Sequence, residues 1–173
     1  MAIRNILQYP NQRLREHGVR ISSVTAEIKA LVDDMAETMY AAPGVGLAAT
    51  QIGVALQLFV IDIASEDEPS DLRVFINPEI LELHETVVWN EGCLSFPGVA
   101  EEIERAARVR VRAIDRDGKT FDLEAEGLLA VAIQHEYDHL QGKLMIDHMG
   151  PLKKRIIQRK MQKRSAEMGD TAE

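Results

Sequence analysis

Residues 127–142 carry the pattern that most restricts how this chain can fold. The segment is mostly apolar and lies between Gly127 and Gly142, which predicts a buried helix that stops at the second glycine. It nevertheless contains the polar run His-Glu-Tyr-Asp-His at residues 135–139. Side chains four residues apart on a helix differ by roughly 40° around its axis, so His135 and His139 project from one face.

The two histidines of this helix are typical of a metal site. Two neutral imidazole nitrogens about one turn apart can bind one divalent metal. Glu136 follows the first histidine, where its carboxylate could take a proton from a water on that metal. The alternative is a partly exposed helix with two chance histidines. Two His, a Glu and an Asp in a buried helix are costly unless they are paired or bind metal, so the pattern favours a metal-dependent hydrolase.

A third protein ligand is needed, and the residues leave several candidates. Asp147 and His148 follow the helix, while Cys93 precedes it in the segment Glu-Gly-Cys-Leu-Ser at 91–95. Gly92 permits close backbone approach beside the cysteine, and a thiolate is a strong ligand for a borderline-soft metal. Cys93 is the single cysteine of the chain, so it forms no internal disulfide. Buried apolar filler and a nucleophile are its other interpretations.

The remaining segments predict helices and hairpin-connected strands. Apolar residues at spacings of three and four predict a helix over 25–41 with Thr25 as its N-cap. Strict alternation over 108–115 predicts a half-buried strand, and Asp117-Gly118 predicts a hairpin into 120–125. We expect an α+β fold with mainly antiparallel sheets around a central metal-binding helix and a C-terminal helix. Its other expected elements are a short helix within 10–18, strands at 56–63, 73–83 and 85–90, and a last helix from Pro151.

Length and charge restrict the domain count and the partners. The 173 residues fit one domain, in which 1–150 form the catalytic part and 151–173 a basic helix and tail. The net charge of −8 argues against general nucleic-acid binding and against a specific DNA partner. Residues 152–164 differ, with seven basic and no acidic side chains. On this helix we expect Leu152, Ile156 and Ile157 to face inward.

The apolar segments are too short for a membrane protein. None approaches the roughly 20 residues that span a bilayer. The first ten residues also lack the long apolar stretch and cleavage site of a secretion signal. We therefore expect a cytoplasmic protein without a membrane partner.

Three segments in order resemble the bacterial peptide deformylases. They are Gly-Val-Gly-Leu-Ala-Ala-Thr-Gln-Ile-Gly at 44–53, the segment 91–95, and Gln-His-Glu-Tyr-Asp-His-Leu at 134–140. The similar region extends from near residue 4 to about residue 165. This resemblance implies a hydrolase of protein biosynthesis that acts on a linear formamide. Its substrates would be N-formylmethionyl nascent peptides, from which it would release formate.

The resemblance assigns roles to residues of the site. It implies one divalent metal per chain, typically ferrous iron, with zinc, nickel or cobalt as substitutes. The ligands would be Cys93, His135 and His139, with Glu136 as acid/base. Gln51 and the backbone N–H of Leu94 would stabilise the oxyanion. Val45, Trp89, Leu128, Val131, Ala132 and His135 would line an apolar methionine pocket, and Gly44 and Gly46 would let a substrate backbone lie close, like an added strand.

Two further features follow from the resemblance. Glu91 and Arg105 match charged positions of the family, and we expect them to pair beside His135, with a solvated surface pair as the alternative. The basic helix would dock on the ribosome near its exit tunnel, where RNA phosphates favour it, the alternative being a solvated face. The chain departs from many relatives after Pro97, because 98–100 (Gly-Val-Ala) lacks a longer polar or basic side chain. The resemblance therefore does not indicate which residues of this chain contact the substrate beyond its methionine.

Three other functions remain open on the residues alone. A zinc metallopeptidase could use the same His-Glu-x-x-His helix and cleave internal peptide bonds. A non-catalytic module could hold a structural zinc, although such sites use four protein ligands and no clear fourth ligand is present. An enzyme with Cys93 as nucleophile would keep its activity after metal removal.

Overall fold

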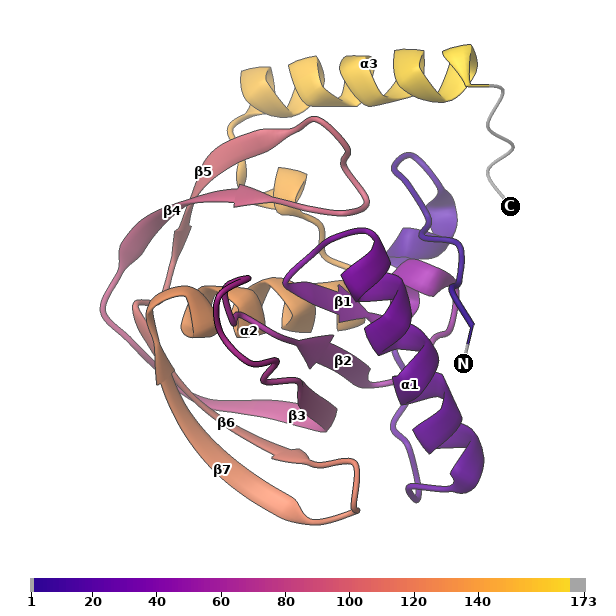
Figure 1. Ribbon diagram of the computed structural model, residues 1–173. Helices are drawn as coiled ribbons and strands as arrows, with labels where there is room; N and C mark the ends of the chain where they lie inside the picture. Colours follow the sequence, from indigo (N-terminus) through magenta and orange to yellow (C-terminus); the bar gives the residue numbers. More distant parts are fainter. Residues whose placement is uncertain (1, 169–173) are drawn as a thin grey trace.

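Two antiparallel sheets and a central helix organise the chain (Figure 1). The computed structural model describes residues 2–168, so the end of the expected basic tail, 169–173, lies outside the described residues. The helices are α1 (Ala26–Ala41), α2 (Gly127–Leu140) and α3 (Pro151–Glu167), with the 3-10 turns η1 (Gln12–Arg15), η2 (Ala49–Ile52) and η3 (Met145–His148). The strands are β1 (Gly46–Ala48), β2 (Leu58–Ile61), β3 (Arg73–His84), β4 (Val87–Gly92), β5 (Ala100–Arg105), β6 (Arg108–Ile114) and β7 (Thr120–Glu126).

The larger sheet has the order β1-β2-β3-β6-β7, and all of its neighbouring strands are antiparallel. Strands β4 and β5 form a separate two-stranded sheet. Figure 1 shows α2 between this hairpin and the larger sheet. The expected α+β class, with mainly antiparallel sheets around a central helix and a C-terminal helix, is confirmed.

Strand β2 joins the two halves of the core because both of its faces are buried. Successive side chains of a strand point to opposite faces. Leu58 and Val60 therefore pack in the cluster that includes α1, while Phe59 and Ile61 pack in the cluster that includes α2. Each side chain of this size stabilises the fold by about 1.5–3 kcal/mol when it is fully buried. This burial of both faces explains why the four residues of β2, Leu-Phe-Val-Ile, are all apolar.

Local signals placed most elements correctly. The Thr25 side chain accepts a hydrogen bond from the Ile28 N–H, which caps α1 as expected. On β6 the apolar Val109, Val111 and Ala113 are buried, as their alternation predicts. Two strands were missed, β1 and β5. β1 has only three residues in a glycine-rich segment, and β5 offers a single large apolar residue in the run Ala-Glu-Glu-Ile-Glu-Arg.

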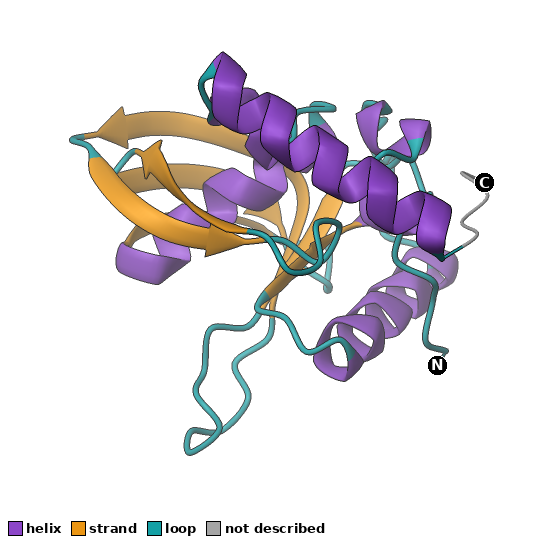
Figure 2. Cartoon of the chain, turned by 90° about the horizontal axis from the view of Figure 1, so that it is seen from above, coloured by secondary structure: helices purple, strands orange, loops and turns teal. Residues whose placement is uncertain are grey.

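Helix α3 packs on the rest of the chain through fewer apolar residues than expected. Ile157 and Met161 are buried, but Leu152 and Ile156 are 72% and 58% exposed. The expectation that Leu152 and Ile156 face inward is wrong, because the contact face is set by the i, i+4 pair 157 and 161. Figure 2 shows α3 nearest the viewer, crossing above the strands. In the described part of the chain no helix, α3 included, is long and apolar enough to cross a membrane.

Candidate metal centre

Helix α2 can present polar side chains because another of its faces is anchored on the large sheet. Ala130 and Ile133 are fully buried in the cluster formed with that sheet. Gly127 has a φ of 63°, a conformation that glycine adopts without strain, so β7 passes directly into α2. The two histidines, His135 and His139, then lie on the side away from Ile133.

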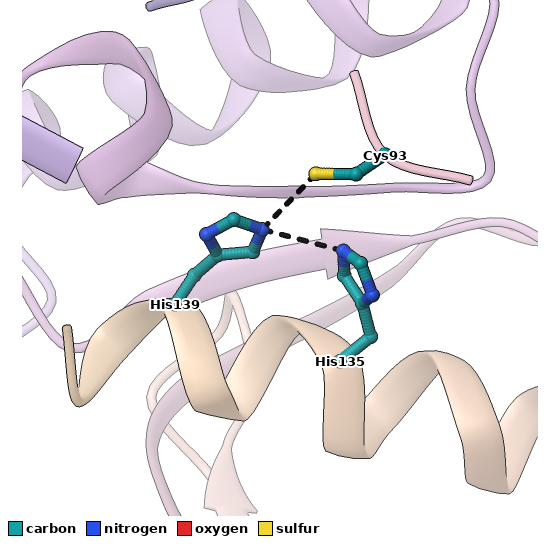
Figure 3. Close-up of side chains that lie close together, drawn as sticks. All are labelled: Cys93, His135 and His139. Carbon is teal, nitrogen blue, oxygen red and sulfur yellow. Dashed lines mark hydrogen bonds between the residues drawn. The ribbon is translucent and has the colours of Figure 1, made fainter. Parts of the chain in front are cut away.

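Cys93, directly after β4, meets the two histidines of α2 (Figure 3). His135 Nε2 lies 3.3 Å from His139 Nε2, and Cys93 Sγ lies 3.4 Å from His139 Nε2. All three ligand atoms lie within 4.8 Å of one another, and no other such group of three occurs among residues 2–168. Metal–nitrogen bonds of about 2.0–2.1 Å and metal–sulfur bonds of about 2.3 Å in a tetrahedron separate the donors by roughly 3.3–3.6 Å. The two distances from His139 Nε2 therefore fit the donor separations around one tetrahedral divalent metal.

The other two candidates for the third ligand lie elsewhere. Asp147 pairs with Arg15 and does not belong to the group of possible metal ligands. His148 Nε2 lies 2.8 Å from Asp138 Oδ2. Of the three candidates that the sequence left open, only Cys93 lies with the histidines.

A buried ion-pair network holds His135. Glu91 Oε1 lies 2.9 Å from His135 Nδ1, and Arg105 donates from Nε and Nη2 to the two oxygens of Glu91 at 2.7 and 2.9 Å. Arg105 Nη1 also donates to Asp138 Oδ2 at 2.7 Å. Burial acts to raise the pKa of Glu91, but hydrogen bonds from Arg105 and His135 hold it below its ordinary value. The carboxylate thus orients the ring so that Nε2 faces the other ligands.

The expected pair of Glu91 and Arg105 is buried, at 5% and 6% exposure, and is no solvated surface pair. Sequence reasoning did not assign Asp138 and His148 to this network, although both had been noted. It also missed Gln134, whose side chain exchanges two 2.9 Å hydrogen bonds with the backbone of Ala106. These contacts tie the end of β5 to α2 and so position the hairpin that carries Cys93.

Glu136 is buried at the bottom of the site. It is 5% exposed, and its Oε1 atom has no hydrogen-bond partner within the described residues. Burial raises the pKa of this carboxyl group to about 7. A carboxyl group with such a pKa can both accept and donate a proton near neutral pH. Burial also holds the pKa of His139 well below its ordinary value, which favours the neutral ring that a metal requires.

Gln51 is held in place within η2. Its Oε1 accepts from the Ala48 N–H at 2.9 Å, and its Nε2 donates to Ser95 Oγ at 3.0 Å. Nε2 also lies 3.8 Å from Cys93 Sγ. Ser95 was not singled out from the sequence, although it lies in the 91–95 segment. The amide thus has a fixed orientation toward the candidate metal ligands.

A cavity of about 710 Å³ connects these groups. Its wall includes most of the residues expected in the site, and His139 and Arg105 lie behind it. Sequence reasoning missed one charged residue of the wall, Arg164 of α3, because it belongs to a run of similar basic residues. The expected residues that line the cavity are Val45, Gly46, Gln51, Trp89, Glu91, Cys93, Leu94, Leu128, Val131, Ala132, His135 and Glu136.

Comparisons with known proteins agree with one another. The family model for polypeptide deformylase matches residues 3–155. A peptide deformylase of Azotobacter vinelandii is 52% identical over 170 residues, covering 98% of this chain and 100% of that protein. One from Alkalilimnicola ehrlichii is 52% identical over 163 residues, covering 94% and 91%. The crystal structure of a peptide deformylase from Legionella pneumophila has a TM-score of 0.90 and 44% identity, covering 98% and 99% of the two chains.

Proposed function

Since this chain belongs to the peptide deformylase family, a family of enzymes, we propose that it removes the formyl group from the N-terminal formyl-methionine of nascent polypeptides and releases formate. The observation that carries the proposal is the meeting of Cys93, His135 and His139 in a cavity that also holds Glu136 and Gln51. Such a cavity combines a metal site, a proton carrier and a hydrogen-bond donor, which hydrolysis of an amide requires.

The three ligands of this proposal are Cys93 Sγ, His135 Nε2 and His139 Nε2, which would hold one divalent metal per chain. The native metal would be ferrous iron, with zinc, nickel or cobalt as substitutes. When bound, such a metal lowers the pKa of water and polarises a carbonyl group. The neutral ring of His139 and the contact of Glu91 with His135 support binding through the nitrogens.

Glu136 is the proton carrier of the proposed reaction. Its carboxylate takes a proton from the attacking water, whose oxygen forms a bond to the formyl carbon. The carboxyl group then gives that proton to the amine nitrogen as the C–N bond breaks, which releases formate and the free N-terminus. The raised pKa of Glu136, about 7, suits both steps.

Gln51 and Leu94 would stabilise the negative charge on the formyl oxygen. Nε2 of Gln51 donates one N–H to Ser95 Oγ and directs the other toward Cys93 Sγ at 3.8 Å, so this second N–H lies beside a proposed metal ligand. The backbone N–H of Leu94, one residue after Cys93, would supply the second donor. One such preorganised donor is typically worth about 3 kcal/mol of transition-state stabilisation.

The apolar part of the cavity would bind the methionine side chain. Its wall there combines Trp89, Val131 and Ala132 with the first turn of α2, and burial of a methionine is worth roughly 1.5–3 kcal/mol. The substrate backbone would lie along Gly46, where no side chain intervenes. The residues proposed for this pocket are Val45, Gly46, Trp89, Leu128, Val131 and Ala132.

A paired assay tests the proposed function. Formate release from formyl-Met-Ala-Ser is measured beside casein cleavage, with the protein purified anaerobically. We expect formate release and no casein cleavage. Casein cleavage without formate release would instead favour the metallopeptidase, which uses the same His-Glu-x-x-His helix.

Replacing Gly46 with alanine should lower formate release by about 100-fold. The added Cβ would lie 2.6 Å from Glu136 Oε2, so the carboxylate must move. A displacement of about 1 Å in a reacting group can reduce the rate by about that factor. The measurement is kcat at saturating substrate. Gly150→Ala is the matched control, because its Cβ meets nothing within 4 Å, and equal activity of the two variants would contradict the expectation.

Replacing Glu91 with glutamine should weaken metal affinity by about 10- to 100-fold, because His135 loses the carboxylate that orients its ring. Metal affinity is measured by competition with a chelator. Glu85→Gln is the control, since it removes the same charge from an exposed pair with Arg108. Unchanged metal retention in Glu91→Gln would show that this contact does not support the site.

We also propose that α3 belongs to the same domain as residues 1–150 and docks on the ribosome. Ile157 and Met161 pack in a core cluster with Phe96 and Ile103, which supports a single domain. We propose a cytoplasmic location, which a ribosomal partner and substrates that emerge from the ribosome would require.

The ribosomal contact is testable through the outward basic residues of α3. Arg155, Arg159 and Lys163 are exposed, whereas Lys153 pairs with Glu101. Changing the three exposed residues to glutamine should weaken ribosome binding and reduce its salt dependence, because fewer phosphate contacts release fewer counterions. Co-sedimentation at several salt concentrations measures both. Binding that is unchanged in strength and in salt dependence would exclude this face, and formate release serves as the folding control.

A further inference from the structure

The inner face of α3 carries two basic residues near the cavity, Lys160 and Arg164, of which Arg164 lines its wall. Lys160 Nζ donates to the Gly98 carbonyl oxygen at 2.9 Å, and Met161 is buried in the cluster beneath. Arg164 follows one turn later on the same side of the helix, and its side chain lines the cavity together with Pro97 and Val99. Arg164 and Glu136 therefore border the same cavity although they come from different helices.

The guanidinium of Arg164 includes a buried donor that is unpaired among residues 2–168. Its Nε atom is buried, and across the described residues it has no hydrogen-bond partner. Two other basic residues of α3 have acidic neighbours, since Lys153 pairs with Glu101 and Lys154 lies 3.7 Å from an Asp147 oxygen. A buried donor without a partner is unfavourable and rare in folded proteins. A bound molecule would supply the acceptor that residues 2–168 do not provide for this guanidinium.

The loop residues beside Arg164, 97–99, carry no charged side chain that could bind a ligand in place of Arg164. Residues 97–99 are Pro-Gly-Val and lie in the wall with it. The net charge of the chain is −8, so the surface as a whole does not attract an acidic peptide. Arg164 is the one lysine or arginine among the residues that line the cavity, whereas the nearby Lys160 donates to the Gly98 carbonyl oxygen. A guanidinium presents a planar pair of donors that matches a carboxylate in two parallel hydrogen bonds.

We propose that Arg164 is a specificity residue that binds an acidic side chain located after the formyl-methionine of the substrate. The inference rests on the proposed function, because it requires that a formylated peptide occupy the cavity. An extended peptide whose methionine lies in the apolar pocket leads its following residues toward the rim, advancing about 3.3 Å per residue. Peptides with aspartate or glutamate within reach of Arg164 are preferred substrates.

A peptide series tests this preference. Formyl-Met-Ala-Ala-Ala with an amidated C-terminus is compared with peptides that carry a single Asp or Asn at the second, third or fourth residue. At one of these positions we expect kcat/KM for formate release to be about fivefold higher with Asp than with Asn, mainly through a lower KM. The preference should shrink at high salt, because added ions screen a partly exposed pair.

Two variants separate local recognition from general charge. Arg164→Gln should remove the preference for Asp, and Arg159→Gln should keep it, because Arg159 is exposed on α3 and does not line the cavity. Equal kcat/KM for Asp and Asn at all three positions in the unmodified enzyme would overturn the proposal while leaving formate release, and thus the proposed function, intact. A preference that persists in Arg164→Gln would also overturn it. No formate from any peptide would overturn the proposed function itself.

Discussion

Replacing Glu136 with alanine should reduce formate release by about 10²- to 10⁴-fold while the protein keeps its metal. The carboxylate lies in the wall of the cavity and is absent from the ligand group of Cys93, His135 and His139. Its loss would remove the proton carrier and leave the ligands in place. Formate release under single-turnover conditions and metal content per chain are measured on the same preparation.

Two companion variants sharpen this result. Glu136→Gln keeps the shape of the side chain but cannot take a proton, so it should be as inactive as Glu136→Ala. His139→Ala should lose both metal and activity, which distinguishes a ligand from a proton carrier. Near-normal formate release by Glu136→Gln would contradict the role proposed for the carboxylate.

Replacing Arg105 with alanine should lower the free energy of unfolding by about 3–5 kcal/mol, because it leaves the buried carboxylate of Glu91 and the partly buried carboxylate of Asp138 without their shared cation. Arg105, at the end of β5, donates to both oxygens of Glu91 on β4 in buried contacts and to Asp138 on α2 in a partly buried one. Urea denaturation of the metal-free protein measures the change without a contribution from metal binding.

Arg112→Ala is the matched control for this prediction. Arg112 also bonds a carboxylate with two nitrogens, on Asp122, but on the exposed face of β6. Exposed pairs of this kind contribute little, so only a small loss of stability is expected there. Equal stability losses in the two variants would show that the buried network does not hold the hairpin on α2.

Local patterns of the sequence were sufficient to predict α2, β6 and the hairpin turn that follows β6. The apolar residues of 127–142 determine which face of the helix packs on the sheet. The histidines of the polar run at 135–139 therefore project from another face. Because that run is interrupted by no turn, the position of His135 relative to His139 follows from helix geometry alone.

Contacts between distant segments could not be derived in this way. β5 is hard to recognise because its inward Arg105 is satisfied by Glu91 and Asp138, so burial there leaves no apolar pattern. The choice of Cys93 over Asp147 and His148 depends on the path of the β4–β5 hairpin, which no local pattern encodes. The assignment of Cys93 as the third ligand came from the resemblance to a family, and the geometry agrees with it.

The orientation of the basic helix α3 also could not be predicted from a local pattern. Seven similar side chains of residues 152–164 gave no reason to distinguish one from another. Packing of Ile157 and Met161 sets the rotation of α3, and that rotation directs Arg164 to the cavity and leaves Arg159 exposed. The same rotation leaves Leu152 and Ile156 in solvent, against the expectation from the sequence.

The most direct test of the central claim is a metal titration of the activity. Protein freed of metal by a chelator under anaerobic conditions is given increasing amounts of ferrous iron, and formate release from formyl-Met-Ala-Ser is measured at each step. If Cys93, His135 and His139 form one catalytic metal site, activity should rise from near zero and level off at about one metal per chain. Full formate release by the metal-free protein would contradict the account.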